Sequence, residues 1–159
     1  GVGAHNTNKV FEKLINRART RYGTQVVFHD NVREVMAYHE DNHIPAAYMI
    51  LADQNPSNPK RCYVANFLNQ KTGFIRGSEG FARKYDLPVL YYKVIKERWG
   101  HYRIDVEVIC EKPSELPDGA IMQRYTELLE ETIKSNPSYW LWSHRRWKHN
   151  FDDAKIGNQ

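Results

Sequence analysis

Residues 102–110 read YRIDVEVIC, and this stretch is the clearest predicted strand in the chain. Apolar and charged residues alternate along it, which is the two-residue period of a strand with one face on a core. The apolar set is Ile104, Val106, Val108 and Cys110, and the charged set is Arg103, Asp105 and Glu107. The alternation therefore predicts a half-buried strand whose apolar face packs on a core.

Further strands are predicted before this one in the chain, at residues 24–29, 46–52, 62–68 and 89–96. The run AAYMILA at 46–52 is apolar throughout, as in a strand that is covered on both faces. Helical spacing of apolar residues predicts helices at 8–22, 31–42 and 74–85, and a last long helix capped by Asp118. Residues 69–73 are predicted to form a polar turn, and Gly77 and Gly80, inside the third helix, predict a close backbone approach.

The order of these elements predicts the α/β class, with helices flanking a mixed, largely parallel sheet. The chain has 159 residues with no repeat or linker, so we expect a single domain over residues 1–159. Cys62 and Cys110 lie in apolar surroundings, which predicts buried, reduced thiols rather than a disulfide. No apolar run approaches the roughly 18 residues that a membrane span needs.

Positive charge is concentrated in two places. The net charge of the chain is +4, and residues 1–23 hold five basic residues against the single acid Glu12. The basic residues of that first stretch are Lys9, Lys13, Arg17, Arg19 and Arg21. The second cluster, Arg145, Arg146 and Lys148, lies near the other end. Such clusters favour anionic partners, although an ordinary solvated face remains the alternative.

Two candidate sites follow predicted strands. Asp53 and Gln54 end the strand at 46–52, where ligands of open α/β sheets bind, although Asp53 could instead cap the following loop. Residues 71–77, KTGFIRG, are predicted to open a helix, whose N–H groups and dipole attract an anion. Thr72 and Arg76 would strengthen such a site, and an ordinary helix start is the alternative.

The third candidate is the ending at residues 139–148, YWLWSHRRWK, where three of the four tryptophans interleave with cations. Arginine forks bind phosphates, and tryptophans suit a lipid boundary or a packed interface. A helical period would put Trp140, His144 and Trp147 on one side. Alternatively, the tryptophans are core and the arginines ordinary surface. No metal site is predicted, because His39 and His43 lie four apart at a helix end without a third ligand.

These three stretches, in this order, resemble the lysophospholipid and lipid A biosynthesis acyltransferase family. YWLWSHRRWK is similar to the family's aromatic–His-Arg-Arg–aromatic–Lys ending, and ILADQNP at 50–56 resembles its strand ending in Asp-Gln. Residues 67–89, FLNQKTGFIRGSEGFARKYDLPV, resemble its Thr-Gly, Ala-Arg and Pro-Val block. The resemblance covers about residues 8–148.

The resemblance implies a partial glycerolphosphate-acyltransferase-like fold and an enzyme without a cofactor. It implies transfer of an acyl chain from acyl carrier protein or acyl-CoA to a hydroxyl of a lipid A precursor. The setting would be the cytoplasmic face of the bacterial inner membrane. Asp53, Gln54, Thr72 and Arg76 would line the cleft, and the first helix would face the anionic membrane surface or the acidic carrier protein. His144, Arg145 and Arg146 would bind phosphate or stabilise the end of the domain.

The family's general base is the histidine of a His-x-x-x-x-Asp/Glu motif. Only His29 and Glu34 have this spacing here, and their context, HDNVREV, resembles the family's middle segment instead. We therefore expect the catalytic histidine and any membrane anchor to lie upstream, and the isolated C-terminal portion to be inactive.

Two rival functions use the same features. One is a nucleic-acid-binding module built on the basic helix and the Trp/Arg ending, but no recognised reader motif is present, so we expect no nucleic-acid partner. The other is a non-catalytic domain that binds anionic lipid or the carrier protein.

Overall fold

The computed structural model describes residues 1–158, and the chain divides into two compact units, Gly1–Leu51 and Ala52–Gln159. Each unit is described by itself. The single domain expected over residues 1–159 stays a prediction.

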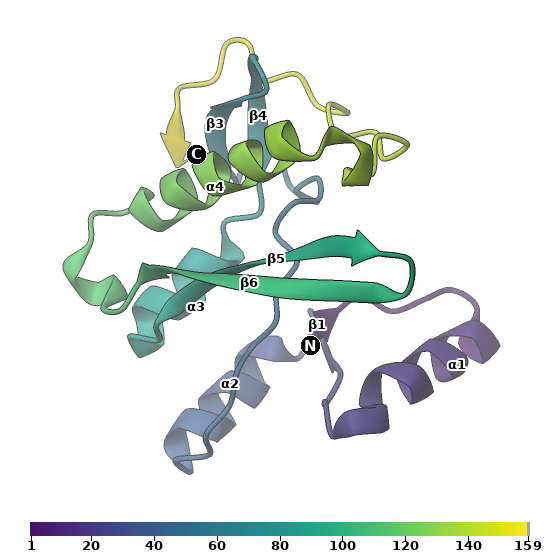
Figure 1. Ribbon diagram of the computed structural model, residues 1–159. Helices are drawn as coiled ribbons and strands as arrows, with labels where there is room; N and C mark the ends of the chain where they lie inside the picture. Colours follow the sequence, from purple (N-terminus) through teal and green to yellow (C-terminus); the bar gives the residue numbers. More distant parts are fainter. Residues whose placement is uncertain (159) are drawn as a thin grey trace. The chain divides into compact units, whose positions relative to one another are not determined.

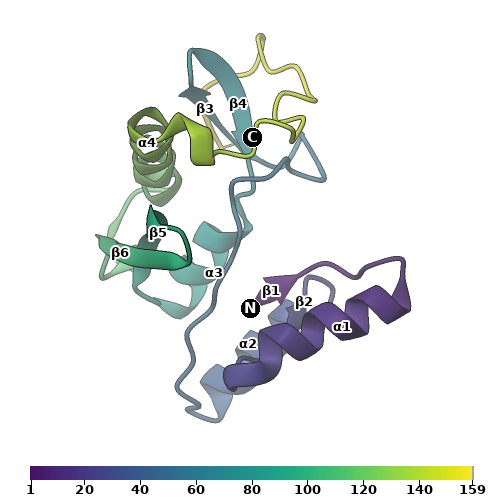
Figure 2. The same cartoon turned by 45° about the vertical axis from the view of Figure 1, so that its right-hand side comes forward.

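The first unit holds two helices and a pair of very short strands. Its elements are β1 (Val2–Gly3), α1 (Lys9–Arg19), a 3-10 turn (Thr20–Tyr22), β2 (Val27–Phe28) and α2 (Val32–Asp41). The parallel pair β1–β2 lies between the helices (Figures 1 and 2). Asn8 caps α1 by accepting from the N–H groups of Val10 and Phe11. Both predicted helices are confirmed.

The strand predicted at residues 46–52 is wrong. These residues form no strand, and Met49 and Leu51 are 54% and 56% exposed. A strand needs a neighbouring backbone to pair with. Here the backbone hydrogen bond that joins this run to β1 runs from the Val2 N–H to the Met49 carbonyl, at 2.9 Å. One such bond does not make a ladder, so the apolar run stays open.

In the second unit, β3 (Tyr63–Phe67), β4 (Gln70–Phe74) and β7 (Gly157–Asn158) form an antiparallel sheet in the order β4-β3-β7. Leu68 and Asn69, with φ of 49° and 63°, join β3 to β4. Two successive left-handed residues make the tight turn whose twist matches a hairpin. The polar turn predicted at 69–73 is therefore wrong, and the next helix, α3 (Gly77–Tyr85), begins later than predicted.

Helix α4 (Ala120–Ser135) lies between this sheet and the hairpin of β5 (Val89–Arg98) and β6 (His101–Cys110), as Figure 1 shows. On one side it builds the main core, which consists of Tyr63, Ala65, Phe67, Phe74, Met122, Leu129 and Ile133. On the other side the Tyr91 hydroxyl of β5 donates to the Thr132 hydroxyl, at 2.9 Å. The helix thus holds the two antiparallel pairs together.

The start of α4 is capped from another helix. Glu79 of α3 is 1% exposed, and its carboxylate accepts from the Gly119 N–H at 2.7 Å and from the Met122 N–H at 3.4 Å. Glu79 therefore satisfies N–H groups that a helix start leaves open. The cap predicted at Asp118 is wrong, because Gly119 occupies the N-cap position of α4, and the Asp118 carboxylate pairs with Arg76.

The predicted close backbone approach at Gly77 and Gly80 is also wrong, since a Cβ at either position would meet nothing within 4 Å. The close approach is at Gly73, where a Cβ would lie 2.5 Å from Cζ of Phe151. Gly73 thus leaves room for the ring that covers β4.

The α/β class is confirmed, but the largely parallel sheet predicted from the sequence is wrong, because the strands of residues 1–158 form three small sheets. Parallel pairing in the described residues is confined to β1–β2, because tight turns make the longer pairs antiparallel. Cys62 and Cys110 are buried and free, as predicted, and burial raises the pKa of the Cys62 thiol.

The strand predicted at 102–110 is confirmed as β6, but its predicted packing is wrong. Ile104, Val106 and Val108 are 62%, 60% and 54% exposed. The charged face contacts α4 instead, where Arg124 donates to Glu107 at 2.7 Å. Because α4 covers the charged face, the apolar face remains open.

Candidate functional site

The aromatic and basic ending is not helical. A 3-10 turn at Pro137–Tyr139 is followed by irregular turns, so the helical grouping considered for this segment is wrong. Trp140 and Trp147 nevertheless both pack against the main core. The ending is therefore fixed to the sheet by its tryptophans.

Arg146 is buried at the centre of this ending, with 3% exposure. Its guanidinium donates through Nη2 to the Gly73 carbonyl at 2.7 Å and through Nη1 to Asn55 Oδ1 at 3.0 Å. It also lies over the Phe74 ring, 4.4 Å from the centroid. Burial lowers the pKa of Arg146 to about 10, and the Asp53 carboxylate acts in the opposite direction. Arg146 thus ties the ending to β4 and to the segment after Asp53.

Nε of Arg146 is buried and has no hydrogen-bond partner among residues 1–158. Two of the guanidinium nitrogens are therefore satisfied while the third is not, in a place closed to solvent. This costs some stability, and the cation–π contact with Phe74 offsets part of that cost.

Thr72 lies inside β4 and is 1% exposed. Its hydroxyl donates to the Gln70 carbonyl at 3.0 Å and accepts from Nε1 of Trp147 at 2.9 Å. Both roles of the hydroxyl are occupied within the protein. Thr72 therefore supports the ending in this structure.

Asn55 joins two of the predicted stretches, and the sequence analysis did not single it out. Its Nδ2 donates to the Arg145 carbonyl at 2.6 Å, while its Oδ1 accepts from Arg146. The available signal was its place directly after Asp53 and Gln54 in ILADQNP. Through Asn55 the structure brings the Asp-Gln segment, β4 and the basic ending together.

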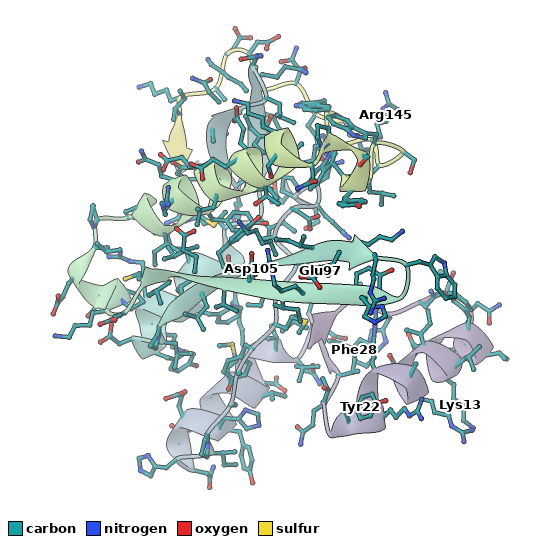
Figure 3. All side chains as sticks on the ribbon, in the orientation of Figure 1. Lys13, Tyr22, Phe28, Glu97, Asp105 and Arg145 are labelled. Atoms are coloured by element: carbon teal, nitrogen blue, oxygen red, sulfur yellow. The ribbon has the colours of Figure 1, made fainter. Side chains whose placement is uncertain are left out.

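The remaining predicted residues differ in exposure. Asp53 and His144 are half-buried, while Gln54 and Arg145 are exposed (Arg145 is labelled in Figure 3). Arg76 precedes α3 and pairs with Asp118 at 2.9 Å, with both side chains partly exposed. Within the described residues, no hydrogen bond or ion pair joins the Arg76 side chain to Asn55 or Arg146.

A small pocket of about 130 Å³ lies between β5 and the end of α4. Its walls are Lys93, Val94, Ile95, Leu129, Thr132, Ile133, Ser135, Asn136, Tyr139 and Trp140. None of the predicted site residues lines it.

The first unit holds three histidine arrangements. His29 and Glu34 are both exposed, and no hydrogen bond or ion pair joins them in residues 1–158. His5 stacks on Phe28, and its two ring nitrogens lie 3.4 Å from Glu12 and from Asp30. With a carboxylate on each nitrogen, His5 has no ring atom left for a substrate hydroxyl.

Residues 39–43, HEDNH, have the H-E-x-x-H spacing of zinc metalloproteases, which requires both histidines on one helical face. Helix α2 ends at Asp41, His43 has a left-handed φ of 53°, and Nδ1 of His39 lies 2.8 Å from the Tyr48 hydroxyl. In the described part of the chain, no three His, Cys, Asp or Glu side chains are grouped to hold a metal. The spacing is therefore not built into a metal site here.

Within residues 1–158, none of the helices combines the length and the apolar character that a bilayer span requires.

Two comparisons bear on the family. A search of curated proteins finds no match. The model of the bacterial lipid A biosynthesis acyltransferases matches residues 1–149, which include all three stretches that meet at Asn55 and Arg146. That match covers nearly the whole chain, and the chain therefore belongs to the bacterial lipid A biosynthesis acyltransferase family.

Proposed function

We propose that this chain forms the acceptor-binding part of a lipid A acyltransferase. The acceptor is a phosphorylated glycolipid, and the donor is acyl carrier protein or acyl-CoA. The observation that carries the proposal is the Asn55 junction, which joins Asp53 and Gln54 to the cationic ending. Family membership supplies the reaction class.

Within this site the residues divide by exposure. The residues whose polar groups are open to solvent face the ligand. These are Gln54, Arg145 and the partly exposed Arg76 and Asp53. Arg145 binds a phosphate group, since an arginine fork matches phosphate oxygens. The ending was expected to bind phosphate or to stabilise the end of the domain. Because Arg146 is buried, it has the second role. Thr72 supports it, and half-buried His144 also stabilises the ending, since its backbone carbonyl accepts from the Arg146 N–H at 2.7 Å.

The reaction forms one bond and breaks one bond. The acceptor hydroxyl oxygen attacks the thioester carbonyl, a C–O bond forms, the C–S bond breaks, and the thiol leaves. The hydroxyl proton passes to an imidazole base and then to the leaving thiolate. We do not assign this base to His29, because no hydrogen bond or ion pair joins it to Glu34 within residues 1–158.

Helix α1 provides the contact with the cytoplasmic face of the inner membrane. Its apolar residues Val10 and Leu14 are 81% and 66% exposed, and no residue of the helix is buried. Lys13 and Arg17 flank them on the helix surface. An amphipathic helix with basic flanks lies in the headgroup region of an anionic bilayer. The same surface also fits the acidic carrier protein.

The test of the substrate site is binding of a bisphosphorylated lipid A precursor, dispersed in a neutral detergent, to the full chain. We expect Arg145→Ala to weaken binding about fivefold, the share of one cation near an anionic surface. Lys112→Ala, which removes an exposed cation paired with Glu115, serves as the matched control and should bind as the wild type does. If Arg145→Ala binds the lipid as tightly as Lys112→Ala does, the proposed substrate site is wrong. Stronger binding to single-stranded DNA than to the lipid would favour the nucleic-acid alternative.

A further inference from the structure

Within the second unit, no helix or strand covers one face of the hairpin of β5 and β6. The register pairs Leu90 with Val108, Tyr92 with Val106, Val94 with Ile104 and Lys96 with Tyr102, and side chains of such alternate pairs share a face. The exposed fractions are 55% for Leu90, 53% for Val94, 63% for Tyr102, 62% for Ile104, 60% for Val106 and 54% for Val108. This set, with Tyr92 and Lys96, is named the open hairpin face.

Charge is sorted between the two faces of the hairpin. By the register, Asp105 and Glu107 lie on the face toward α4, and Glu97 lies at the irregularity between Lys96 and Arg98 (Figure 3 labels Glu97 and Asp105). Arg103 pairs with Glu97 at 3.7 Å and with Asp105 at 2.8 Å. Arg124 pairs with Glu107 at 2.7 Å. The acids of the hairpin strands are thus held by arginines, and the open hairpin face carries no acid.

The charge that remains on the open hairpin face is positive. Lys96 lies at its end, and the turn beside it presents Arg98 and Trp99, whose side chain is 90% exposed. An indole ring that is exposed next to cations suits the boundary between water and lipid headgroups, where tryptophan is enriched. Aliphatic side chains, an exposed indole and unopposed cations together are complementary to an anionic phospholipid surface.

A second copy of the chain fits this face less well. Seven residues of a two-stranded ribbon extend about 24 Å by about 10 Å, a few hundred Å², whereas a stable interface takes about 800 Å² per partner. Contiguous apolar patches of a few hundred Å² on an otherwise polar surface mark interaction sites. The cations at the end of the face would also repel those of a symmetric partner.

We propose that the open hairpin face docks on the headgroup and upper acyl region of an anionic phospholipid bilayer, with Trp99 inserted among the headgroups. The contact belongs to the second unit and does not require α1 or the acceptor site. It goes beyond the proposed function, because it assigns a second, separate membrane contact to the chain.

The experiment uses the full chain and vesicles of phosphatidylethanolamine and phosphatidylglycerol, with and without lipids brominated near the headgroup. We expect brominated lipid to quench tryptophan emission in the wild type, and the quenched fraction to vanish in Trp99→Phe. Quenching should persist in Leu14→Glu, which places a charge on α1 and leaves the hairpin intact. Failure of the α1 contact and failure of the hairpin contact are therefore distinguishable.

The paired variant Ile104→Glu/Val106→Glu gives an independent measurement. Because both side chains are already exposed, the free energy of unfolding should be unchanged. The partition coefficient onto vesicles should fall at least about tenfold. Quenching that is equal in the wild type and in Trp99→Phe would overturn the proposal. Dimerisation of the wild type, abolished by the paired variant in the absence of lipid, would overturn it in favour of a second copy.

Discussion

Arg146 and Val106 lie in the same unit, yet the cation is 3% exposed and the aliphatic side chain is 60% exposed. Arg146 is buried because Asn55, Gly73 and Phe74 provide two acceptors and a ring face. Val106 is exposed because α4 covers the opposite side of its strand. The comparison between the basic ending and the hairpin teaches that available partners, rather than polarity alone, decide which side chains this fold buries.

The largest expected effect comes from removing the buried side chain of Arg146. Arg146→Ala should lower the free energy of unfolding by about 3–5 kcal/mol, because it leaves buried polar groups unpaired and a cavity. The neighbouring Arg145→Ala should change it by less than about 0.5 kcal/mol, because this side chain is exposed. Urea unfolding measures both, and equal losses would contradict the burial of Arg146.

A smaller loss is expected from crowding the strand that Arg146 binds. Gly73→Ala should cost about 1–3 kcal/mol, because its Cβ would collide with the Phe151 ring. Gly80→Ala, in open space within α3, should stabilise by about 0.5–1 kcal/mol through helix propensity. Thermal unfolding of the pair checks this, and a stabilising Gly73→Ala would refute the packing of Phe151 on β4.

Alkaline pH tests the ring that lies between the two regions. Tyr125 contacts Phe74 and Tyr91, and burial raises its pKa well above the ordinary value. The folded state then retains a proton that the unfolded state loses above about pH 10, so stability should fall as pH rises from there. Arg146, whose pKa is lowered to about 10, acts in the opposite direction and reduces the fall. Tyr125→Phe should flatten the decline of the free energy of unfolding between about pH 9 and about pH 11, as measured by urea unfolding. An unchanged slope would contradict the burial of this hydroxyl.

The smallest effect is expected at the open end of the comparison. Val106→Thr keeps the side-chain shape and should change stability by less than about 0.5 kcal/mol. Val64→Thr in β3, where the side chain is fully buried, should cost about 1–3 kcal/mol. Guanidinium unfolding distinguishes the pair, and a large loss at Val106 would show that something covers the hairpin.

Local patterns predicted the elements that depend on local contacts. The helices, β3 and β6 follow from periodicity, and the buried thiols follow from apolar surroundings. The strand predicted at 46–52 failed because pairing requires a partner backbone that periodicity cannot supply. The hairpin at Leu68 and Asn69 was missed because neither residue is the glycine that usually marks such a turn.

The candidate site was predicted as three separate stretches, and the sequence could not show how they are joined. Arg146 forms hydrogen bonds with Gly73, which is 73 positions away along the chain, and with Asn55, which is 91 positions away. Adjacent arginines in one motif have no local signal that would bury one and expose the other. Asn55 was not predicted for the same reason, because its role comes from its contacts with Arg145 and Arg146 and not from its residue type.

The most direct test is carbene footprinting of the full chain in solution, which labels side chains in proportion to their exposure. We expect strong labelling of Ile104, Val106 and Val108 and almost none of Arg146, with the hairpin labelling suppressed by anionic vesicles. Labelling of Arg146 equal to that of the hairpin valines, or hairpin labelling that vesicles leave unchanged, would contradict the contrast between a buried Arg146 and an open, lipid-facing hairpin.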